Sequence, residues 1–482
     1  MRILLASSEI HPFSKTGGLA DMVGALGKYL ALAGHEVGVV TPLYLGIRDK
    51  FKQIGPDEAS FTLPLGVEQV SATVAKLEIA ERLTAYFLDQ PDFYQRPGLY
   101  GEKGADYPDN AERFIFFSKS VVHLARVLPF RPQIVHAHDW QVGPVPLLLR
   151  HGRAWEGWTR APRSCFTIHN LAYQGNFPSW KYSLTNLPWD YFTPAGLEFF
   201  GFLNCLKAGL VYADFLTTVS PRYAREITTE QLGHGLDGVL RTRQKDLLGI
   251  LNGVDYDEWN TTRNRLLAKP YSANDLAGKA TAKLQLQEEL GLPQTLEVPV
   301  FGTVSRLADQ KGIDILLGAL EEMLSANMQF VLLGSGQTEY ERALRDLAAR
   351  YPAKAAARLG YDHALSHRIE AGCDFFLMPS QFEPCGLNQM YSLRYGTIPI
   401  VRATGGLDDS VVDISEDLER ADGIKFYEYS SRPLAKAIRK AIVLFENKEL
   451  LEEYRRNAMQ VDFSWARTAA DYIEVYKRAL AK

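Results

Sequence analysis

The sequence predicts an α/β protein with two domains, each built around a parallel sheet, and three observations lead to this class. Short runs rich in Val, Ile and Leu recur without polar alternation, which is typical of strands buried on both faces. These runs end in Gly, Pro, Ser or Asp and lead into amphipathic segments, so that strands alternate with helices. The runs also fall into two series, separated by a polar stretch that follows residue 255.

Length and composition agree with this class. At roughly 150 residues per domain, 482 residues suggest two or three domains. Hydrophobic residues at 46% and charged residues at 23% exclude general disorder, collagen and coiled coil. A net charge of −4 gives no electrostatic footprint for nucleic acid or an anionic membrane, so neither is expected as a partner. Four cysteines without framework spacing argue against a disulfide scaffold or a zinc ribbon. No stretch approaches the ~18 apolar residues of a membrane helix, and we expect a cytoplasmic protein.

The predicted elements follow in order along the chain. In the first series a helix covers Gly17–Leu32, and the strands are Ile3–Ser7, Glu36–Val40, Ile134–His138, Cys165–Ile168, Phe215–Val219 and Leu248–Leu251. In the second series the strands are Val298–Val304, Phe330–Leu333, Asp374–Met378 and Ile398–Val401, and an amphipathic helix over Trp465–Leu480 follows. Because open α/β sheets bind ligands at the carboxyl ends of their strands, we expect two facing sheets to form a cleft there.

A glycine turn, Lys15-Thr16-Gly17-Gly18-Leu19, follows the first strand and opens a helix. Paired glycines allow close backbone approach, and free N–H groups at a helix start favour an anion, to which Lys15 adds a mobile positive charge. Neither GxGxxG nor GxxxxGK[ST] is present here. A tight turn with a solvated lysine is the alternative. The turn is echoed at Ala403-Thr404-Gly405-Gly406-Leu407 in the second half.

Two cations, Arg306 and Lys311, flank a second turn that lies between a predicted strand and a helix. Such a pair can converge on one polyanion and stabilise a diphosphate leaving group without a metal. Two solvated surface cations are the alternative.

A third segment, Pro379 to Gln389, places Glu383 after a strand and Gly386 at the expected start of a helix. The amides of that helix start would hold phosphate or sugar hydroxyls. The alternative for Glu383 is a charge at a helix N-terminus. Cys385 is expected to be a packed small residue rather than a nucleophile, because no His or Asp stands near it in sequence.

Histidines end two strands of the first series, in His136-Ala137-His138-Asp139-Trp140 and in Thr167-Ile168-His169-Asn170. Metal ligation is disfavoured because neither segment offers an i, i+4 helical pair. Sugar recognition suits Asp139 and His169 better, while His136 can equally be a satisfied core residue. Aromatic side chains that offer a sugar-binding surface, or simply pack, are Tyr94, Tyr100, Trp140, Trp180, Trp189 and Trp259. An Asp255-Tyr256-Asp257 match to a metal-binding DxD motif is weak.

In their order along the chain, these segments resemble the family of bacterial glycogen synthases and plant starch synthases. The set also includes Asn252-Gly253-Val254-Asp255, and the similarity runs from about residue 1 to the C-terminus. The resemblance implies a GT-B glycosyltransferase with two Rossmann-like domains facing across a deep cleft. The acceptor-side domain would be residues 1–252, the nucleotide-sugar-binding domain 253–462, and the last helix, about 463–482, would return to the first domain. The implied reaction transfers glucose from ADP-glucose to the non-reducing end of an α-1,4-glucan such as glycogen, with retention and without metal or cofactor.

The resemblance also implies roles for individual residues. Lys15, Arg306 and Lys311 would bind the diphosphate, assisted by Gly18 and the amides of Cys385, Gly386 and Leu387. His169 and Asp139 would face the transferred glucose and the acceptor, Glu383 would bind sugar hydroxyls, Asn252 would lie in the cleft, and Tyr361 would contact adenine.

Other functions remain open at this stage. They are a UDP-glucose-using or other retaining GT-B enzyme, a phosphorylase with a pyridoxal lysine, and a non-catalytic sugar- or nucleotide-binding protein. Tyr391 stands where related retaining families place a second glutamate, which disfavours the sucrose- and trehalose-linked families. Asp408 and Asp409 make the second glycine turn more acidic than the family pattern.

Overall fold

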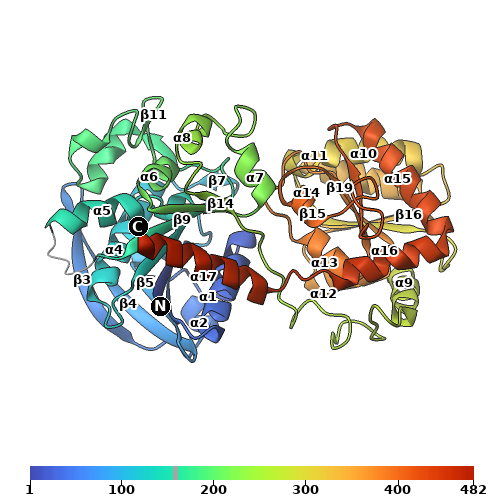
Figure 1. Ribbon diagram of the computed structural model, residues 1–482, viewed down its shortest axis with the longest axis horizontal. Coiled ribbons are helices and arrows are strands. Elements are labelled where there is room, and N and C mark those ends of the chain that lie inside the picture. Colours follow the sequence, from blue (N-terminus) through green and yellow to red (C-terminus); the bar gives the residue numbers. More distant parts are fainter. Residues whose placement is uncertain (156–160) are drawn as a thin grey trace. The chain divides into compact units, whose positions relative to one another are not determined.

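The chain forms two compact units in the computed structural model, which describes residues 1–155 and 161–482 (Figure 1). Unit 1 comprises Met1–Val219, Ala224–Gly253 and Trp465–Lys482. Unit 2 comprises Ser220–Tyr223 and Val254–Ser464. Each unit contains one large, mainly parallel sheet, as the two series of apolar runs predict.

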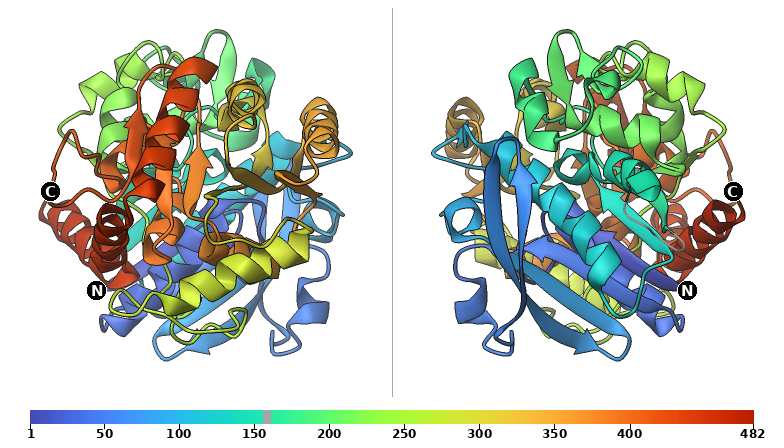
Figure 2. Two further views of the ribbon diagram at one scale, coloured as in Figure 1. Left: turned by 90° about the vertical axis from the view of Figure 1, so that its right-hand side faces the viewer. Right: turned by 90° about the vertical axis from the view of Figure 1, so that its left-hand side faces the viewer.

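The sheet of unit 1 has nine strands in the order β14-β13-β9-β8-β1-β2-β5-β4-β3. Their bounds are β1 (Arg2–Ala6), β2 (Glu36–Pro42), β3 (Asp57–Leu65), β4 (Glu68–Ala80), β5 (Leu83–Asp89), β8 (Ile134–His138), β9 (Arg163–Ile168), β13 (Phe215–Thr218) and β14 (Leu247–Gly249). All neighbours from β14 to β5 are parallel, whereas β4 and β3 extend the edge as antiparallel strands. The right-hand view of Figure 2 shows these long edge strands in blue.

The strands that the sequence predicts in the first half correspond to β1, β2, β8, β9, β13 and β14, which form most of the parallel part of this sheet. β1 and β8 are almost wholly buried, which explains their unbroken apolar runs. The three strands from β3 to β5 were not predicted. β4, which pairs with β5 and β3, mixes exposed and buried positions along its length, so an unalternated apolar run is absent.

Helix α17 (Trp465–Ala481) belongs to unit 1, where it contacts α1 (Gly18–Leu32) and β9 (Figure 1). Its Tyr476 hydroxyl lies 2.8 Å from Nδ1 of His136 in β8. The other helical segments of this unit are α2 (Ile47–Lys50), α3 (Pro91–Tyr94), α4 (Asn110–Val127), η1 (Trp140–Val142), α5 (Val145–Trp155), η2 (Ser179–Thr185), η3 (Trp189–Tyr191), α6 (Cys205–Tyr212) and α8 (Asp237–Thr242), and α7 (Pro221–Glu226) spans the boundary. Two small sheets comprise β6 (Gly101–Glu102) with β7 (Ala105–Asp106), and β10 (Asn176–Pro178), β11 (Glu198–Phe199) and β12 (Phe202–Asn204).

The sheet of unit 2 is parallel throughout, with strand order β17-β16-β15-β18-β19-β20. The bounds are β15 (Val300–Leu307), β16 (Gln329–Gly336), β17 (Ala355–Leu359), β18 (Phe375–Met378), β19 (Ile398–Arg402) and β20 (Ile424–Phe426). Successive side chains of one strand enter two separate apolar cores, such as Leu332 in one and Leu333 in the other. A sheet covered on both faces accounts for strands without polar alternation.

Helices supply the other side of both cores (Figure 2, left). One core is completed by α10 (Ile313–Met323), α11 (Thr338–Arg350), α15 (Ser431–Glu446) and α16 (Lys448–Gln460), and the other by α9 (Ala277–Leu290), α12 (His363–Gly372) and α14 (Gly405–Ser410). The remaining segments are η4 (Asp309–Lys311) and α13 (Asn388–Arg394). Among the described residues, no helix combines the length and apolarity that crossing a membrane requires.

Candidate active site

Loops at the carboxyl ends of β15 and β18 are joined in unit 2. The Gln381 backbone N–H donates to the Gln310 carbonyl at 2.8 Å, and the Gln310 side chain donates to the Phe382 carbonyl at 3.2 Å. Gly312 closes the first loop with φ = 69°, and a Cβ there would lie 2.0 Å from the Pro379 carbonyl oxygen. Only glycine permits both this conformation and this approach. The two loops therefore form one rigid edge of the sheet.

A buried ion pair connects the same two loops. Lys311 Nζ lies 2.5 Å from Oε2 of Glu383, and the Ser380 hydroxyl donates to that oxygen at 3.1 Å. Glu383 is only 6% exposed. Helix α13 begins five residues later, at Asn388, so Glu383 does not lie in its first turn. The alternative of a helix N-terminal charge is therefore wrong, and Glu383 is the partner of Lys311.

Arg306 differs from Lys311 in that its side chain is available. It lies at the end of β15, is exposed, and forms no ion pair within residues 1–155 and 161–482. An exposed guanidinium at the carboxyl edge of a parallel sheet can form a bidentate contact with an incoming phosphate.

The segment from Cys385 to Leu387 corrects one expectation. Gly386 does not open a helix: it has φ = 70°, and α13 starts at Asn388 after Leu387. The Gln389 side chain donates to the carbonyls of Cys385 and Gly386, both at 3.1 Å. Cys385 is 5% exposed, as expected of a packed small residue.

The second glycine turn packs against this segment. A Cβ on Gly405 would lie 1.9 Å from the Glu383 carbonyl oxygen, and one on Gly406 would lie 2.0 Å from the carbonyl oxygen of Cys385. The Gly406 N–H donates to the Glu383 carbonyl at 3.1 Å. The paired glycines thus let a third loop, after β19, support the loop that carries Glu383.

The acidic continuation of this turn is compensated within unit 2. Lys425 Nζ lies 3.0 Å from Asp408 and 2.9 Å from Glu416. The Arg222 backbone N–H donates to Asp409 at 2.5 Å. Asp408 and Asp409 therefore hold neighbouring elements rather than adding two free negative charges.

Tyr361 follows β17 at the same edge of the sheet and is 85% exposed. The next residue, Asp362, caps α12 by accepting a hydrogen bond from the Leu365 N–H at 2.8 Å. The cap fixes the backbone next to Tyr361, so the exposed aromatic ring is attached to an ordered segment.

In unit 1 the first glycine turn opens α1 at Gly18, and Gly17 and Gly18 are both exposed. Lys15 is not a free cation here, because its Nζ lies 2.7 Å from Asp21 in the first turn of that helix. Glu9 stabilises the turn from its buried side. It is 3% exposed and accepts hydrogen bonds from the Thr16 hydroxyl and the Tyr100 hydroxyl, both at 2.7 Å.

Glu9 was not predicted as a site residue. Its sequence signal is a carboxylate placed a few residues after the first strand and before the glycine turn. Position alone could have suggested that it lies near Lys15, but the sequence does not show that the carboxylate turns inward.

The histidines at the ends of β8 and β9 have different partners. His136 is fully buried and lies 2.8 Å from the Tyr476 hydroxyl and 2.6 Å from Thr167 Oγ1, so the core alternative describes it. His138 Nδ1 lies 3.1 Å from His169 Nε2. Burial lowers the pKa of His136 and of His169 to about 3, so that both imidazoles are neutral at neutral pH.

Asp139 supports the turn after β9. Its carboxylate accepts the His169 backbone N–H at 2.7 Å, and its own backbone has φ = 64°, an uncommon value outside glycine. Burial raises the pKa of Asp139 to about 7, against the lowering effect of backbone hydrogen bonds from His169 and Asn170. Asn252, also in unit 1, is 6% exposed, and its Oδ1 is buried without a partner in the described part of the chain.

Two of the weaker sequence signals are structural. Tyr94 and Trp259 are buried at 0% and 8% exposure, whereas Trp180 and Trp189 remain mostly exposed. In the DxD match, Asp255 accepts the backbone N–H of Asp257 at 2.9 Å, which is a local turn.

In each unit, loops at the carboxyl ends of the parallel strands carry charged or polar side chains: Arg306, Lys311 and Glu383 in unit 2, and Asp139 and His169 in unit 1. Two units, each built on a mainly parallel sheet with charged or polar loops after its strands, have the architecture of the GT-B class of glycosyltransferases.

Comparisons with known proteins give the family. Residues 2–242 match the family model for the starch synthase catalytic domain, and residues 283–461 match that for glycosyl transferases group 1. A glycogen synthase from Koribacter versatilis (strain Ellin345) is 47% identical over 99% of this chain and 98% of its own length. One from Myxococcus xanthus (strain DK1622) is 47% identical over the full length of both chains.

A solved structure extends the similarity. The catalytic domain of starch synthase IV from Arabidopsis thaliana, bound to ADP and acarbose, has a TM-score of 0.90 at 32% identity and covers 100% of this chain and 99% of its own. Anabaena Alr3699/HepE in complex with UDP, at 13% identity and a TM-score of 0.58, shares the fold over 99% of this chain and 100% of its own. The chain belongs to the starch and glycogen synthase family and is a glycosyltransferase. The predictions of fold class, family and enzyme class are confirmed.

Proposed function

We propose that this enzyme elongates an α-1,4-glucan in the cytoplasm by transferring glucose from ADP-glucose with retention of configuration. The observation that carries the proposal is the joined edge of the second sheet, where Lys311, from the loop after β15, pairs with Glu383, from the loop after β18, and Arg306 ends β15 as an exposed cation. The bound ADP named for the related plant starch synthase supports the nucleotide, and the names of the bacterial relatives support the glucan.

The cations serve the leaving group. Breaking the bond between C1 and the diphosphate builds negative charge on the phosphate oxygens, and fixed cations favour that charge more than the ground state. In this proposal Arg306 makes the principal contact because its guanidinium has no competing partner among the described residues. Lys311 would contact the diphosphate while paired with Glu383, and Lys15 would contact it after its ion pair with Asp21 breaks. Gly18 and the backbone amides of residues 385–387 would donate further hydrogen bonds to the phosphates.

The sugar is held by neutral and carboxylate groups. Positive charge develops at C1, and the His169 carbonyl and Glu383 would supply lone pairs near it. His169 is neutral because burial lowers its pKa to about 3, so its ring can bond a hydroxyl without opposing the positive sugar. Asp139 fixes the His169 backbone, and the unpartnered Oδ1 of Asn252 offers a further acceptor for a hydroxyl. Tyr361 would stack against adenine.

The test measures incorporation of labelled glucose into glycogen from ADP-glucose and from UDP-glucose, offered separately and in competition. We expect transfer from ADP-glucose and a marked preference for it over UDP-glucose. Arg306→Ala should lose transfer while binding glycogen as tightly as the unmodified enzyme. A folded protein that binds ADP-glucose and glycogen but transfers no glucose would contradict the proposed enzymatic activity. A preference for UDP-glucose would contradict the proposed donor.

A further inference from the structure

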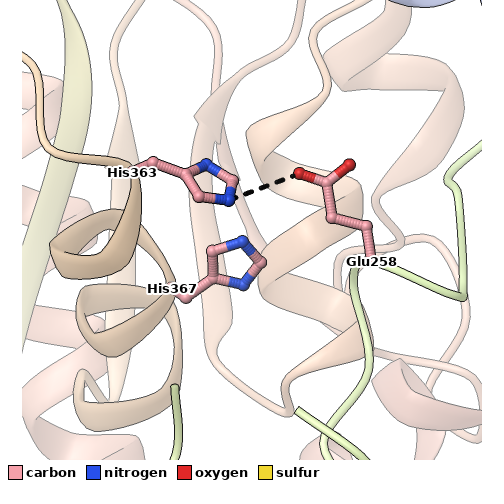
Figure 3. A group of neighbouring side chains, drawn as sticks. All are labelled: Glu258, His363 and His367. Atoms are coloured by element: carbon pink, nitrogen blue, oxygen red, sulfur yellow. Dashed lines mark ion pairs between the residues drawn. The ribbon is translucent and has the colours of Figure 1, made fainter. Parts of the chain in front are cut away.

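Helix α12 presents two histidines one turn apart, close to a glutamate from a distant part of unit 2. His363 and His367 are related by i, i+4, and Glu258 lies in the segment between the end of unit 1 and α9. Each of the three offers one ligand atom, and these atoms all lie within 4.8 Å of one another. Figure 3 shows both rings and the carboxylate directed toward one small region.

His367 is the fixed member of this group. It is 1% exposed, and its ring stacks on Trp259 with centroids 3.9 Å apart. Its Nδ1 lies 2.9 Å from the Tyr395 hydroxyl and 3.1 Å from the Asn264 side-chain nitrogen. Its Nε2 is buried and has no hydrogen-bond partner in the part of the chain that the structure describes. A buried ring nitrogen without a partner has lost its hydrogen bonds to water and gained none in return, which costs free energy. A bound ligand would supply the missing interaction.

Nδ1 of His367 is engaged by the Tyr395 hydroxyl and the Asn264 side-chain nitrogen, whereas Nε2 faces the neighbouring imidazole and carboxylate (Figure 3).

His363 and Glu258 can adapt to an ion. Their side chains are 50% and 45% exposed, and His363 Nε2 lies 3.6 Å from Glu258 Oε1. With bonds of ~2.0–2.1 Å, the ligand atoms of a tetrahedral zinc ion are about 3.4 Å apart. The imidazole–carboxylate distance already approaches this value, and rotation of the two exposed side chains can close the wider gaps around fixed His367.

We propose that Glu258, His363 and His367 bind one divalent transition-metal ion of the zinc class, with water completing the coordination. Two imidazoles and one carboxylate suit zinc and its neighbours, whereas Mg²⁺ and Ca²⁺ prefer oxygen ligands throughout. The ion would fasten the segment that carries Glu258 to the first turns of α12. The glucosyl transfer proposed above does not use it, so the site can be tested without substrate.

The test uses the full chain, stripped with a chelator and titrated with Zn²⁺ by calorimetry, and with Co²⁺ for its visible absorption. We expect one equivalent to bind and to raise the Tm. His363→Ala and Glu258→Gln should each weaken binding by at least about tenfold, since even outer-shell changes cost ~10–100-fold. Asp257→Asn, which removes the adjacent exposed carboxylate, is the matched control and should bind normally. Both ligand substitutions are at exposed side chains, so the metal-free Tm should not change.

Two results would overturn the proposal. One is the absence of saturable binding in excess zinc. The other is binding that persists undiminished in His363→Ala, which would place the ion elsewhere, for example at one of the four free cysteines.

Discussion

Removing the Lys311 ammonium should destabilise unit 2 in addition to impairing transfer. The side chains of Lys311 and Glu383 are 20% and 8% exposed. Within residues 1–155 and 161–482, Lys311→Ala therefore leaves a buried carboxylate with only the Ser380 hydroxyl as a side-chain hydrogen-bond donor. Breaking a buried pair costs ~3–5 kcal/mol. Because Lys311 is partly exposed and the Ser380 bond remains, we expect about 3 kcal/mol. For a unit of this size that is a fall in Tm of roughly 6–12 °C.

The same reasoning predicts a rescue. Glu383→Gln in the Lys311→Ala background removes the uncompensated charge and should recover most of the lost Tm, while ADP-glucose-dependent transfer stays low. The assay is thermal unfolding of the four proteins of this double-mutant cycle, combined with transfer of labelled glucose to glycogen. Equal unfolding temperatures for the unmodified protein and Lys311→Ala would refute the argument. So would a double variant no more stable than Lys311→Ala, because the penalty would then not reside in Glu383.

Three further outcomes are expected. Arg306→Ala should lower kcat by ~10²–10³ with an unchanged Tm, and Arg306→Lys should lower it less; a loss of Tm would show that the arginine is structural. The unfolded chain binds more protons than the folded one between the folded pKa of His136, about 3, and its usual value of ~6.5, so stability falls as pH drops through this range. His136→Gln should remove about 2 kcal/mol of the difference in unfolding free energy between pH 7 and pH 5 in urea titrations; an unchanged difference would contradict the assignment. Gly406→Ala should displace the Glu383 loop and lower both Tm and transfer, whereas Gly17→Ala, where a Cβ meets no atom within 4 Å, should leave Tm unchanged.

The central strands of both sheets were predictable because burial on both faces leaves an unbroken apolar run, as in β8 and β18. The ends of the strands were less predictable than their existence. Leu248–Leu251 was expected as a strand, but β14 runs from Leu247 to Gly249, since pairing with β13 rather than local hydropathy decides its ends. Strands such as β4, in which exposed and buried positions mix, escape this criterion altogether.

The positions of the candidate residues near strand ends were predictable from the sequence, whereas their ion-pair partners were not. Motif order placed Lys15, Lys311 and Glu383 at the carboxyl ends of strands. Sequence could not show that Lys15 is bound to Asp21 or that Lys311 is bound to Glu383, because those partners depend on side-chain direction and tertiary packing.

The histidine pair of α12 has an i, i+4 spacing that sequence does display. The histidines that end the strands of unit 1, His136 and His169, lack this spacing, whereas His363 and His367 have it. The third member, Glu258, is more than a hundred residues away, and only the folded chain brings it near.

The return of α17 to the first sheet has a consequence for biosynthesis. Unit 1 lacks its last helix, and His136 lacks the Tyr476 hydroxyl, until more than 200 residues of unit 2 have left the ribosome. At ~5–20 residues per second, the earlier part of unit 1 waits roughly 10–40 s for this closing element. During that interval the surface that α17 later covers is open to chaperones and to other nascent chains, so helix-blocking substitutions near Trp465 should reduce the yield of native enzyme more than its specific activity.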